Sequence, residues 1–331
     1  MSRTFQALVV RTSDKKNFTR SIEERSIDDL PKGEVLIRVH YSSLNYKDGL
    51  SCAGNRGVTR HYPHTPGIDA AGVVESSDSS DFNAGDPVVI ISYDLGANTA
   101  GGFGQFIRVP ADWVMPLPEG LSFRESMIYG TTGYTAGLSV NLLQHQGVIP
   151  ERGPIVVTGA TGGVGSISVA LLAGLGYRIS ASTGKPDAED FLKTLGASEV
   201  IDRKSVNDES GRTLLKEVWA GAVDTVGGNT LVTILKSCKQ RGSVVTAGMV
   251  DSSNLHASVF PFVLRGISMQ GTGASETTMA MRQEIWSKLA KEWKPDKLEY
   301  LAVDRKLEQL DPEIDRILVG GQRGRVVVDL Q

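Results

Sequence analysis

Cysteine is scarce in this chain of 331 residues: there are only two, Cys52 and Cys238, and they lie far apart in the sequence. They could form one bridge at most, which excludes a fold held by a disulfide framework and favours a reducing, cytoplasmic setting. The N-terminus lacks the apolar core and the cleavage site of a signal peptide, so we expect Met1–Leu8 to enter the first strand.

Neither sign of charge is in clear excess. There are 35 Lys and Arg against 38 Asp and Glu, so the net charge is only −3, and this balance gives no reason to expect nucleic acid or an anionic membrane as a partner. A long stretch, Gly153–Tyr177, has no charged residue but contains seven glycines. Because glycine destabilises a helix, we expect a buried strand, a turn and a buried helix there instead of a membrane span.

The length of the chain favours two domains. The first part contains short runs rich in Val, Ile or aromatic residues, separated by turn signals, and this spacing predicts a compact β unit of barrel type. The strands expected there are Phe5–Val10, Val35–Tyr41, Ala71–Ser76, Pro87–Ile91 and Phe103–Val109.

The pattern then changes to strands that alternate with helices, which predicts a doubly wound parallel sheet. The strands expected in this sheet are Ile155–Thr158, Tyr177–Ser182, Glu199–Ile201, Ala222–Thr225, Ser243–Ala247 and Ser268–Gln270. A last helix, Thr278–Trp293, and a last strand, Arg325–Asp329, are expected to return to the β unit.

The strongest motif is the Gly-rich turn Gly159–Gly165, which follows an apolar strand and opens a helix. It fits the dinucleotide fingerprint with Ala160 at the position of the first glycine, followed by Gly162 and Gly165. Gly162 would let the backbone approach a pyrophosphate at the helix N-terminus, and Gly165 would let the helix pack on the strand. Ala160 can make the turn provided that its φ stays negative.

The residues that follow the second strand of this sheet indicate the cofactor. An enzyme that uses NAD would place Asp or Glu there to bind the ribose 2′-hydroxyl, but this chain has Ser182-Thr183-Gly184-Lys185. Arg203 closes the next strand and could join Lys185 around a 2′-phosphate, which favours NADPH. The alternative is that both cations are ordinary solvated surface charges.

Two further groups of residues could carry chemistry. Cys52, His61 and His64 are close in sequence, but no acidic residue or second cysteine completes a zinc site around them. Asn45, Tyr46 and Asp48 lie at the end of a predicted strand, where Tyr46 could donate a proton or hold a nicotinamide and Asn45 could polarise a carbonyl. A solvated turn is the alternative interpretation of this segment.

Together these residues resemble the medium-chain dehydrogenase/reductase superfamily and, within it, the bacterial acryloyl-CoA reductase and quinone oxidoreductase subgroup. The resemblance runs nearly from end to end. Its marks, besides the Gly-rich turn, are Ser43–Asp48, Pro66–Gly72, Gly130–Ala136, Leu195–Ala197, Val223–Gly228, Pro261–Arg265 and Gly324–Val326.

The resemblance implies a GroES-like β-barrel catalytic domain made of residues 1–124 and 272–331, with a Rossmann dinucleotide-binding domain at 125–271. In the zinc alcohol dehydrogenases a cysteine stands at the position of Asn45, and their Gly-His-Glu motif matches Gly67-Ile68-Asp69 here. Their four-cysteine structural loop is missing. The resemblance therefore implies an enzyme without zinc, and the family is usually a homodimer.

Carried over residue by residue, the catalytic positions fall on Asn45, Tyr46 and Asp69. The expected contacts of NADPH are Tyr46, Thr132, Ala160, Thr161, Gly162, Gly163, Val164, Ser182, Thr183, Gly184, Lys185, Arg203, Met249, Val263 and Ala274. Where close relatives often have a serine, this chain has Ala274 beside Ser275, and Gly320-Gly321 replaces a polar side chain of relatives.

The resemblance implies a zinc-independent, NADPH-dependent reductase that transfers hydride to the activated C=C of a short enoyl thioester such as acryloyl-CoA. An NADPH:quinone oxidoreductase is the alternative. A non-catalytic NADPH-binding protein is a second alternative, against which the intact Asn45, Tyr46 and Asp69 argue. In the thioester reaction Asn45 or backbone N–H groups would stabilise an enolate oxygen, and Tyr46 or a water would supply a proton.

Overall fold

The computed structural model describes residues 3–331, and the chain divides into two compact units. Unit 1 holds the chain up to Thr131 together with Thr278–Gln283 and Glu299–Gln331, and unit 2 holds Thr132–Thr277 and Glu284–Leu298. The expected boundaries, after residues 124 and 271, differ from these by several residues. The reason is that α2 (Phe123–His145) and α7 (Met279–Ala290) each belong to both units, so the division falls inside helices, where the sequence has no linker.

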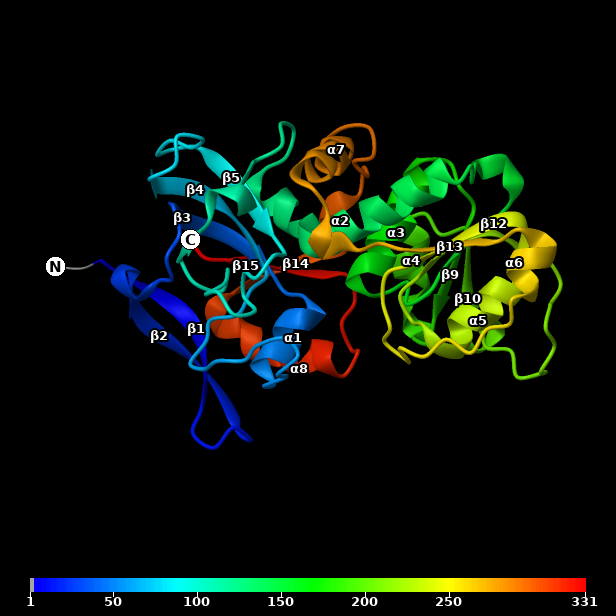
Figure 1. Cartoon of the computed structure of the whole chain (residues 1–331), viewed down its shortest axis with the longest axis horizontal. Coiled ribbons are helices and arrows are strands. Elements are labelled where there is room, and N and C mark those ends of the chain that lie inside the picture. Colours follow the sequence, from blue (N-terminus) through cyan, green and yellow to red (C-terminus); the bar gives the residue numbers. More distant parts are fainter. Residues whose placement is uncertain (1–2) are drawn as a thin grey trace. The chain divides into compact units, whose positions relative to one another are not determined.

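Unit 1 is built on β-strands, drawn in blue, cyan and red in Figure 1. A small sheet pairs β1 (Thr4–Thr12) with β2 (Phe18–Ser26), and a seven-stranded sheet has the order β14-β15-β3-β4-β5-β7, with β6 paired to β3. The strands of the larger sheet are β3 (Val35–Ser43), β4 (Asp69–Ser77), β5 (Pro87–Ile91), β6 (Phe106–Val109), β7 (Met115–Pro116), β14 (Ala302–Lys306) and β15 (Arg325–Asp329).

Buried apolar side chains alternate with more exposed ones along these strands, and the buried ones form the core of unit 1. Val35, Ile37 and Val39 are buried on one face of β3, because successive side chains of a strand point to opposite faces. Two helices, α1 (Tyr46–Cys52) and α8 (Leu310–Leu318), pack on each other.

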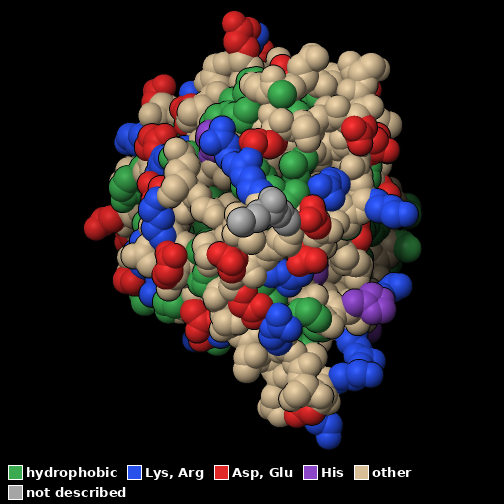
Figure 2. All heavy atoms as spheres, turned by 90° about the vertical axis from the view of Figure 1, so that its left-hand side faces the viewer, with side chains coloured by type: hydrophobic (Ala, Val, Ile, Leu, Met, Phe, Trp, Pro, Cys, Tyr) green, Lys and Arg blue, Asp and Glu red, His purple; other side chains and the backbone are tan. Residues whose placement is uncertain are grey.

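Acidic and basic side chains are interspersed on the face of the molecule shown in Figure 2.

Unit 2 contains a six-stranded sheet in which every neighbouring pair of strands is parallel. Its order is β10-β9-β8-β11-β12-β13, which is the doubly wound order of a dinucleotide-binding sheet and confirms the predicted fold class. The strands are β8 (Ile155–Val157), β9 (Ile179–Thr183), β10 (Glu199–Asp202), β11 (Trp219–Asp224), β12 (Cys238–Thr246) and β13 (Ser268–Gly271). The helices are α3 (Gly163–Gly174), α4 (Glu189–Thr194), α5 (Gly228–Ser237) and α6 (Phe260–Arg265).

Gly153–Tyr177, the uncharged stretch, forms β8, a turn and α3, as its glycines predict. No helix within residues 3–331 is both long enough and apolar enough to cross a membrane.

Candidate functional site

The Gly-rich turn of unit 2 has the geometry that a dinucleotide fingerprint requires. Gly159 takes a positive φ of 56°, whereas Ala160 does not, which meets the condition for a residue with a side chain at this position. A Cβ on Gly165 would lie 2.3 Å from the carbonyl oxygen of Gly159, so only glycine allows α3 to pack this closely on the strand. Gly162 is the N-cap of α3, which leaves the first N–H groups of the helix available to an anion.

A buried carboxylate supports this turn where the strand order reverses between β8 and β11. Asp224 accepts a hydrogen bond from the Thr158 hydroxyl (2.6 Å) and from the backbone N–H of Gly227 (2.8 Å). The Thr225 hydroxyl donates in turn to the carbonyl of Thr158 (2.9 Å). Ligands of doubly wound sheets bind at this reversal, and the three contacts hold the turns that follow β8 and β11 together.

The residues expected to distinguish NADPH from NAD lie together at the end of β9. Ser182 and Thr183 are buried, and the carbonyl of Ser182 accepts from the N–H of Ala160 (3.1 Å). Arg203 lies against Gly184: a Cβ on Gly184 would be 2.8 Å from both Cδ and Nε of Arg203. The Arg203 side chain is exposed, and no carboxylate of residues 3–331 pairs with it. The end of β9 therefore has beside it the guanidinium of Arg203, which follows β10, where enzymes specific for NAD carry an acid.

Four further expected cofactor contacts of unit 2 lie on other elements. Met249 follows β12 and Val263 lies on α6, both largely exposed, while Ala274 begins a 3-10 turn and Thr132 lies on α2. The loop of Met249 packs on the loop after β11, where the N–H of Asp251 donates to the carbonyl of Val226 (2.9 Å).

In unit 1 the structure brings Asn45, Asp48 and Asp69 into one buried cluster. The Asn45 side-chain amide donates to Asp69 Oδ2 (2.8 Å), to Asp48 Oδ2 (3.2 Å) and to the carbonyl of Ser43 (3.2 Å). Thr131 donates to Asp69 Oδ1 through its hydroxyl (2.6 Å) and its backbone N–H (3.0 Å). The solvated turn considered for this segment is therefore not what forms, since Asn45 and Asp48 are buried and α1 begins at Tyr46.

The buried cluster changes the ionisation of the Asp48 carboxyl group. It accepts from the backbone N–H groups of Asn45 (2.8 Å), Gly67 (3.1 Å) and Ile68 (2.8 Å). These bonds favour the carboxylate, but burial and the nearby charge of Asp69 outweigh them and raise the pKa of Asp48 to about 7.

Tyr46 differs from its neighbours because its side chain is 50% exposed, against 3% for Asn45. Both hydrogens of the Asn45 amide already have acceptors inside unit 1, so Asn45 can donate to a substrate oxygen only by giving up one of these bonds. Of the three expected catalytic residues, Tyr46 is thus the one whose side chain reaches the surface of its unit.

The sequence did not identify several members of the cluster. Ser43 donates to Asp69 Oδ2 (2.6 Å), and the guanidinium of Arg325, at the start of β15, lies 3.9 Å from the same oxygen. Both residues fall inside motifs that mark the family resemblance, but a serine or an arginine within a strand gives no sign of its partners before the sheet is known.

The possible zinc ligands Cys52, His61 and His64 do not form a site. Cys52 is buried, His61 is exposed, and the ring of His64 pairs with the carbonyl of Gly96 (2.9 Å). Within the described residues no three His, Cys, Asp or Glu side chains are grouped to hold a metal.

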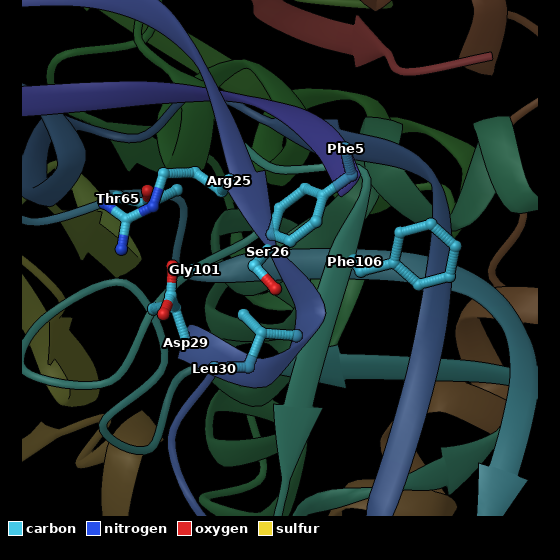
Figure 3. A pocket seen from close by; sticks show the side chains of 9 residues that line it. Phe5, Arg25, Ser26, Asp29, Leu30, Thr65, Gly101 and Phe106 are labelled. Carbon is cyan, nitrogen blue, oxygen red and sulfur yellow. The ribbon is translucent and has the colours of Figure 1, made fainter. Parts of the chain in front are cut away.

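A small cavity of unit 1 has no connection with these groups. It lies beside the hairpin of β1 and β2, with the rings of Phe5 and Phe106 on one side and Arg25 and Asp29 among its other lining residues (Figure 3). Its volume of about 30 Å³ suits one or two waters and not a nucleotide.

Comparison with known proteins agrees with this architecture. The family described as alcohol dehydrogenase GroES-like domain matches residues 31–119, and the family described as zinc-binding dehydrogenase matches residues 163–291. The chain is 44% identical to the quinone oxidoreductase YhfP of Bacillus subtilis over the whole length of both chains. It is 42% identical to the acrylyl-CoA reductase AcuI of Ruegeria pomeroyi over 98% of this chain and 99% of that protein.

Solved structures lead to the same group. A crystal structure of the yhdH oxidoreductase of Salmonella enterica in complex with NADP is 39% identical and superimposes with a TM-score of 0.95, covering 98% of this chain and all of that one. That of YhfP with NAD bound gives a TM-score of 0.96 at 43% identity, covering 99% and 100%. The chain belongs to the medium-chain dehydrogenase/reductase superfamily, among relatives named acrylyl-CoA reductase and quinone oxidoreductase.

Proposed function

We propose that this protein reduces the activated C=C of a short enoyl thioester such as acryloyl-CoA. Its family identifies it as an NADPH-dependent oxidoreductase, and so do the structures of relatives from Salmonella enterica and Escherichia coli, which hold NADP and NADPH. The YhfP structure holds NAD instead, so the choice of cofactor depends on the residues of this chain. The guanidinium of Arg203 over Gly184, with no acid in Ser182–Lys185, favours the 2′-phosphate.

The residues of unit 2 fit a dinucleotide. The first turn of α3, from Gly163 and Val164, offers backbone N–H groups to the pyrophosphate, and Gly162 allows close approach. Thr183 and Arg203 would flank the ribose that bears the 2′-phosphate. When bound, NADPH supplies the hydride.

The observation that carries the proposed reaction is the closed cluster of Asn45, Asp48 and Asp69. These side chains bond to each other and to Thr131 instead of presenting ligands to a metal. Alcohol oxidation of the zinc-dependent kind requires a Lewis acid to stabilise an alkoxide. Conjugate reduction does not require a Lewis acid, because the negative charge that develops on an enolate oxygen can be stabilised by neutral donors.

We assign the direct contact with the reacting molecules to Tyr46. Its exposed phenol can donate a proton to the α-carbon or hold a water that does so, and its position directly after Asn45 couples it to the buried cluster. Asn45 and Asp69 then act on Tyr46 indirectly, because their hydrogen bond fixes the conformation of the turn into α1. Asn45 also donates a hydrogen bond to the enolate oxygen when its amide gives up one of its bonds inside the cluster.

The thioester is preferred to a quinone because its CoA portion can bind away from the reacting bond and orient it. The test compares NADPH oxidation by the purified protein with acryloyl-CoA, crotonyl-CoA, a simple benzoquinone and no acceptor. We expect kcat/KM to be highest with a thioester. Efficient reduction of the quinone with neither thioester reduced would replace this proposal by the quinone oxidoreductase, and no turnover of any acceptor would leave a non-catalytic NADPH-binding protein.

We further propose a cytoplasmic homodimer formed through unit 2. β13 is one of the two edge strands of the parallel sheet, and an edge strand can pair with a second copy. The neighbouring segment exposes large apolar side chains, as a subunit interface requires: Met249, Val250, Leu255, Val259, Phe260, Val263 and Leu264. Sedimentation of the intact protein, compared with a V259D/L264D double variant, tests this; a monomeric wild type at micromolar concentration would rule it out.

A further inference from the structure

Arg325 is a buried cation with no role in the function proposed so far. It is the first residue of β15 and is 2% exposed. Burying a guanidinium is costly unless its donors are satisfied. Here the donors meet acceptors from two separate segments of unit 1: Nε donates to the carbonyl of Ile128 (3.0 Å), Nη1 to the carbonyl of Leu44 (3.0 Å) and to Asn45 Oδ1 (3.3 Å), and Nη2 to Ser43 Oγ (2.7 Å).

These contacts converge on the turn that leads from β3 into α1. Ser43, Leu44 and Asn45 are consecutive and are all bonded to the same guanidinium, and the next residue is Tyr46. The fork geometry of arginine fixes several acceptors at once, which an ammonium group on a flexible stem does not. The side chain of Arg325 therefore sets the direction in which Tyr46 leaves the strand.

The guanidinium also compensates the buried acids. Ser43 Oγ accepts from Arg325 and donates to Asp69 Oδ2, which forms a continuous chain from the cation to the carboxylate. Among the described residues, Arg325 is the only cation within 4.0 Å of Asp69. Removal of Arg325 would leave the buried Asp69 carboxylate without a counter-charge. It would also leave three acceptors at the turn before Tyr46, on Ser43, Leu44 and Asn45, without this donor.

We infer that Arg325 is a positioning residue that holds Ser43–Asn45 and thereby places the Tyr46 side chain for the reaction. This inference rests on the role of Tyr46 given under Proposed function. It is separable from folding of the sheet, because β15 pairs with β3 through backbone contacts such as the bond from the N–H of Leu44 to the carbonyl of Val326 (3.0 Å).

The test compares R325K with R282K. Arg282 is an equally buried arginine of unit 1 that donates to the carbonyl of Ile91 (3.2 Å) and lies over the ring of Tyr93, so it controls for replacement of a buried guanidinium. With the acceptor that the wild type uses best, we expect R325K to lower kcat roughly tenfold to a hundredfold. The KM for NADPH should change little, because most of its expected contacts lie in unit 2, and R282K should lose thermal stability without this loss of kcat.

A double-mutant cycle with Y46A asks whether Arg325 acts through Tyr46. If it does, R325K should lower kcat by no more than about twofold in the Y46A background, since the group that it positions is gone. Multiplicative losses would overturn the inference, and so would a folded R325K with wild-type kcat. Y46A with wild-type kcat would instead refute the role of Tyr46, whichever acceptor is used.

Two further variants keep the test decisive if R325K does not fold. S43A removes one acceptor of Arg325 and one donor to Asp69 without leaving a charge buried alone, and it should show the same loss in kcat to a smaller degree. R325A assayed with added guanidinium at a non-denaturing concentration should regain part of its kcat, whereas added guanidinium should not raise the kcat of R282A, which is not expected to fall. A wild-type kcat for S43A together with no rescue of R325A would refute the inference.

Discussion

A Cβ placed on Gly130 would lie 2.3 Å from Oδ2 of Asp69 and 2.7 Å from Oγ of Ser43. Gly130 also interrupts α2 with φ 51° and ψ −154°, a conformation essentially confined to glycine. The interruption turns the N–H of Thr131 toward the Asp69 carboxylate (3.0 Å). One glycine thus makes room for the buried carboxylate and also directs a donor to it.

We expect G130A to destabilise the protein strongly. The strained backbone alone costs about 1–3 kcal/mol, and the added methyl group must also displace Asp69. Urea unfolding followed by circular dichroism measures the change. G174A is the matched control, because a Cβ on Gly174, at the end of α3, meets no atom within 4 Å; it should be neutral or slightly stabilising. Equal stability of the two variants would contradict the strain assigned to Gly130.

R203A should weaken NADPH and leave NADH nearly unchanged. A hydrogen bond to a charged group contributes on the order of 1.5–3 kcal/mol, so the affinity for NADPH should fall roughly tenfold to a hundredfold. G184A should act in the same direction, because the new methyl group would displace Arg203. Titration of both cofactors by fluorescence measures this, with the exposed neighbour Lys204 changed to Ala as the control. Equal losses of affinity for NADPH and NADH would contradict the assignment of Arg203 as the residue that binds the 2′-phosphate.

The sequence could predict the fold wherever a pattern is local. Pro87–Ile91 and Arg325–Asp329 form strands with the expected bounds, because each is a short apolar run between turn signals. β2 was not predicted, since Phe18–Ser26 is rich in charge and pairs only with β1 at the edge of unit 1. α2 was not predicted because Gly130 and two following threonines interrupt any helical pattern, although the helix continues to His145.

Below neutral pH, Asp48 should make the protein more stable as the pH falls. Its pKa in the fold is about 7, against about 3.9 for an unfolded aspartate. Between these values the folded state binds a proton that the unfolded state does not, so this group adds stability as the pH drops from 7 toward 4 and loses it as the pH rises. The slope is at most about 1.4 kcal/mol per pH unit.

D48N isolates this contribution. The asparagine cannot ionise, so the difference in unfolding free energy between wild type and variant should change with pH over this range. The variant should also be less stable throughout, because its NH₂ group would face one of the backbone donors that Asp48 accepts from. D81N, at an exposed position, is the control. A constant difference between wild type and D48N from pH 4 to 7 would show that Asp48 is ionised throughout.

Both thiols should resist modification by thiol reagents in the native protein. Cys52 and Cys238 are free and buried, and burial raises the pKa of Cys238 to about 12 and that of Cys52 further still. Since the thiolate is the reactive form, neither should react near neutral pH until the chain unfolds. Titration with a disulfide reagent should find both thiols in denaturant and neither without it; rapid reaction of the native protein would contradict the burial of the group concerned.

The parts of the site that the sequence missed depend on distant segments. Asn45 was found because its motif follows a strand, and Asp69 through the family resemblance, but the strand-end pattern suggested that Asn45 acts directly on a carbonyl. The structure shows its amide bonded to its near neighbour Asp48 and to Asp69, and the contact with Asp69 becomes evident only when β3 and β4 are placed side by side. Arg325 is nearly 200 residues from Ile128, one of its acceptors, and no local pattern records such a pairing.

Zinc should be absent from the purified protein, and chelation should leave its activity unchanged. The positions that match a cysteine and a histidine ligand of the zinc alcohol dehydrogenases hold Asn45 and Ile68, and neither an amide nitrogen nor an aliphatic side chain binds zinc. The remaining carboxylate, Asp69, already accepts bonds from Ser43, Asn45 and Thr131, so a metal would have to displace a set of short hydrogen bonds. Metal analysis by mass spectrometry should find far less than one zinc per chain, and NADPH oxidation should be the same before and after dialysis against a chelator. Stoichiometric zinc whose removal abolishes activity, and whose return restores it, would mean that the cluster rearranges to bind metal and that the proposed chemistry must be replaced.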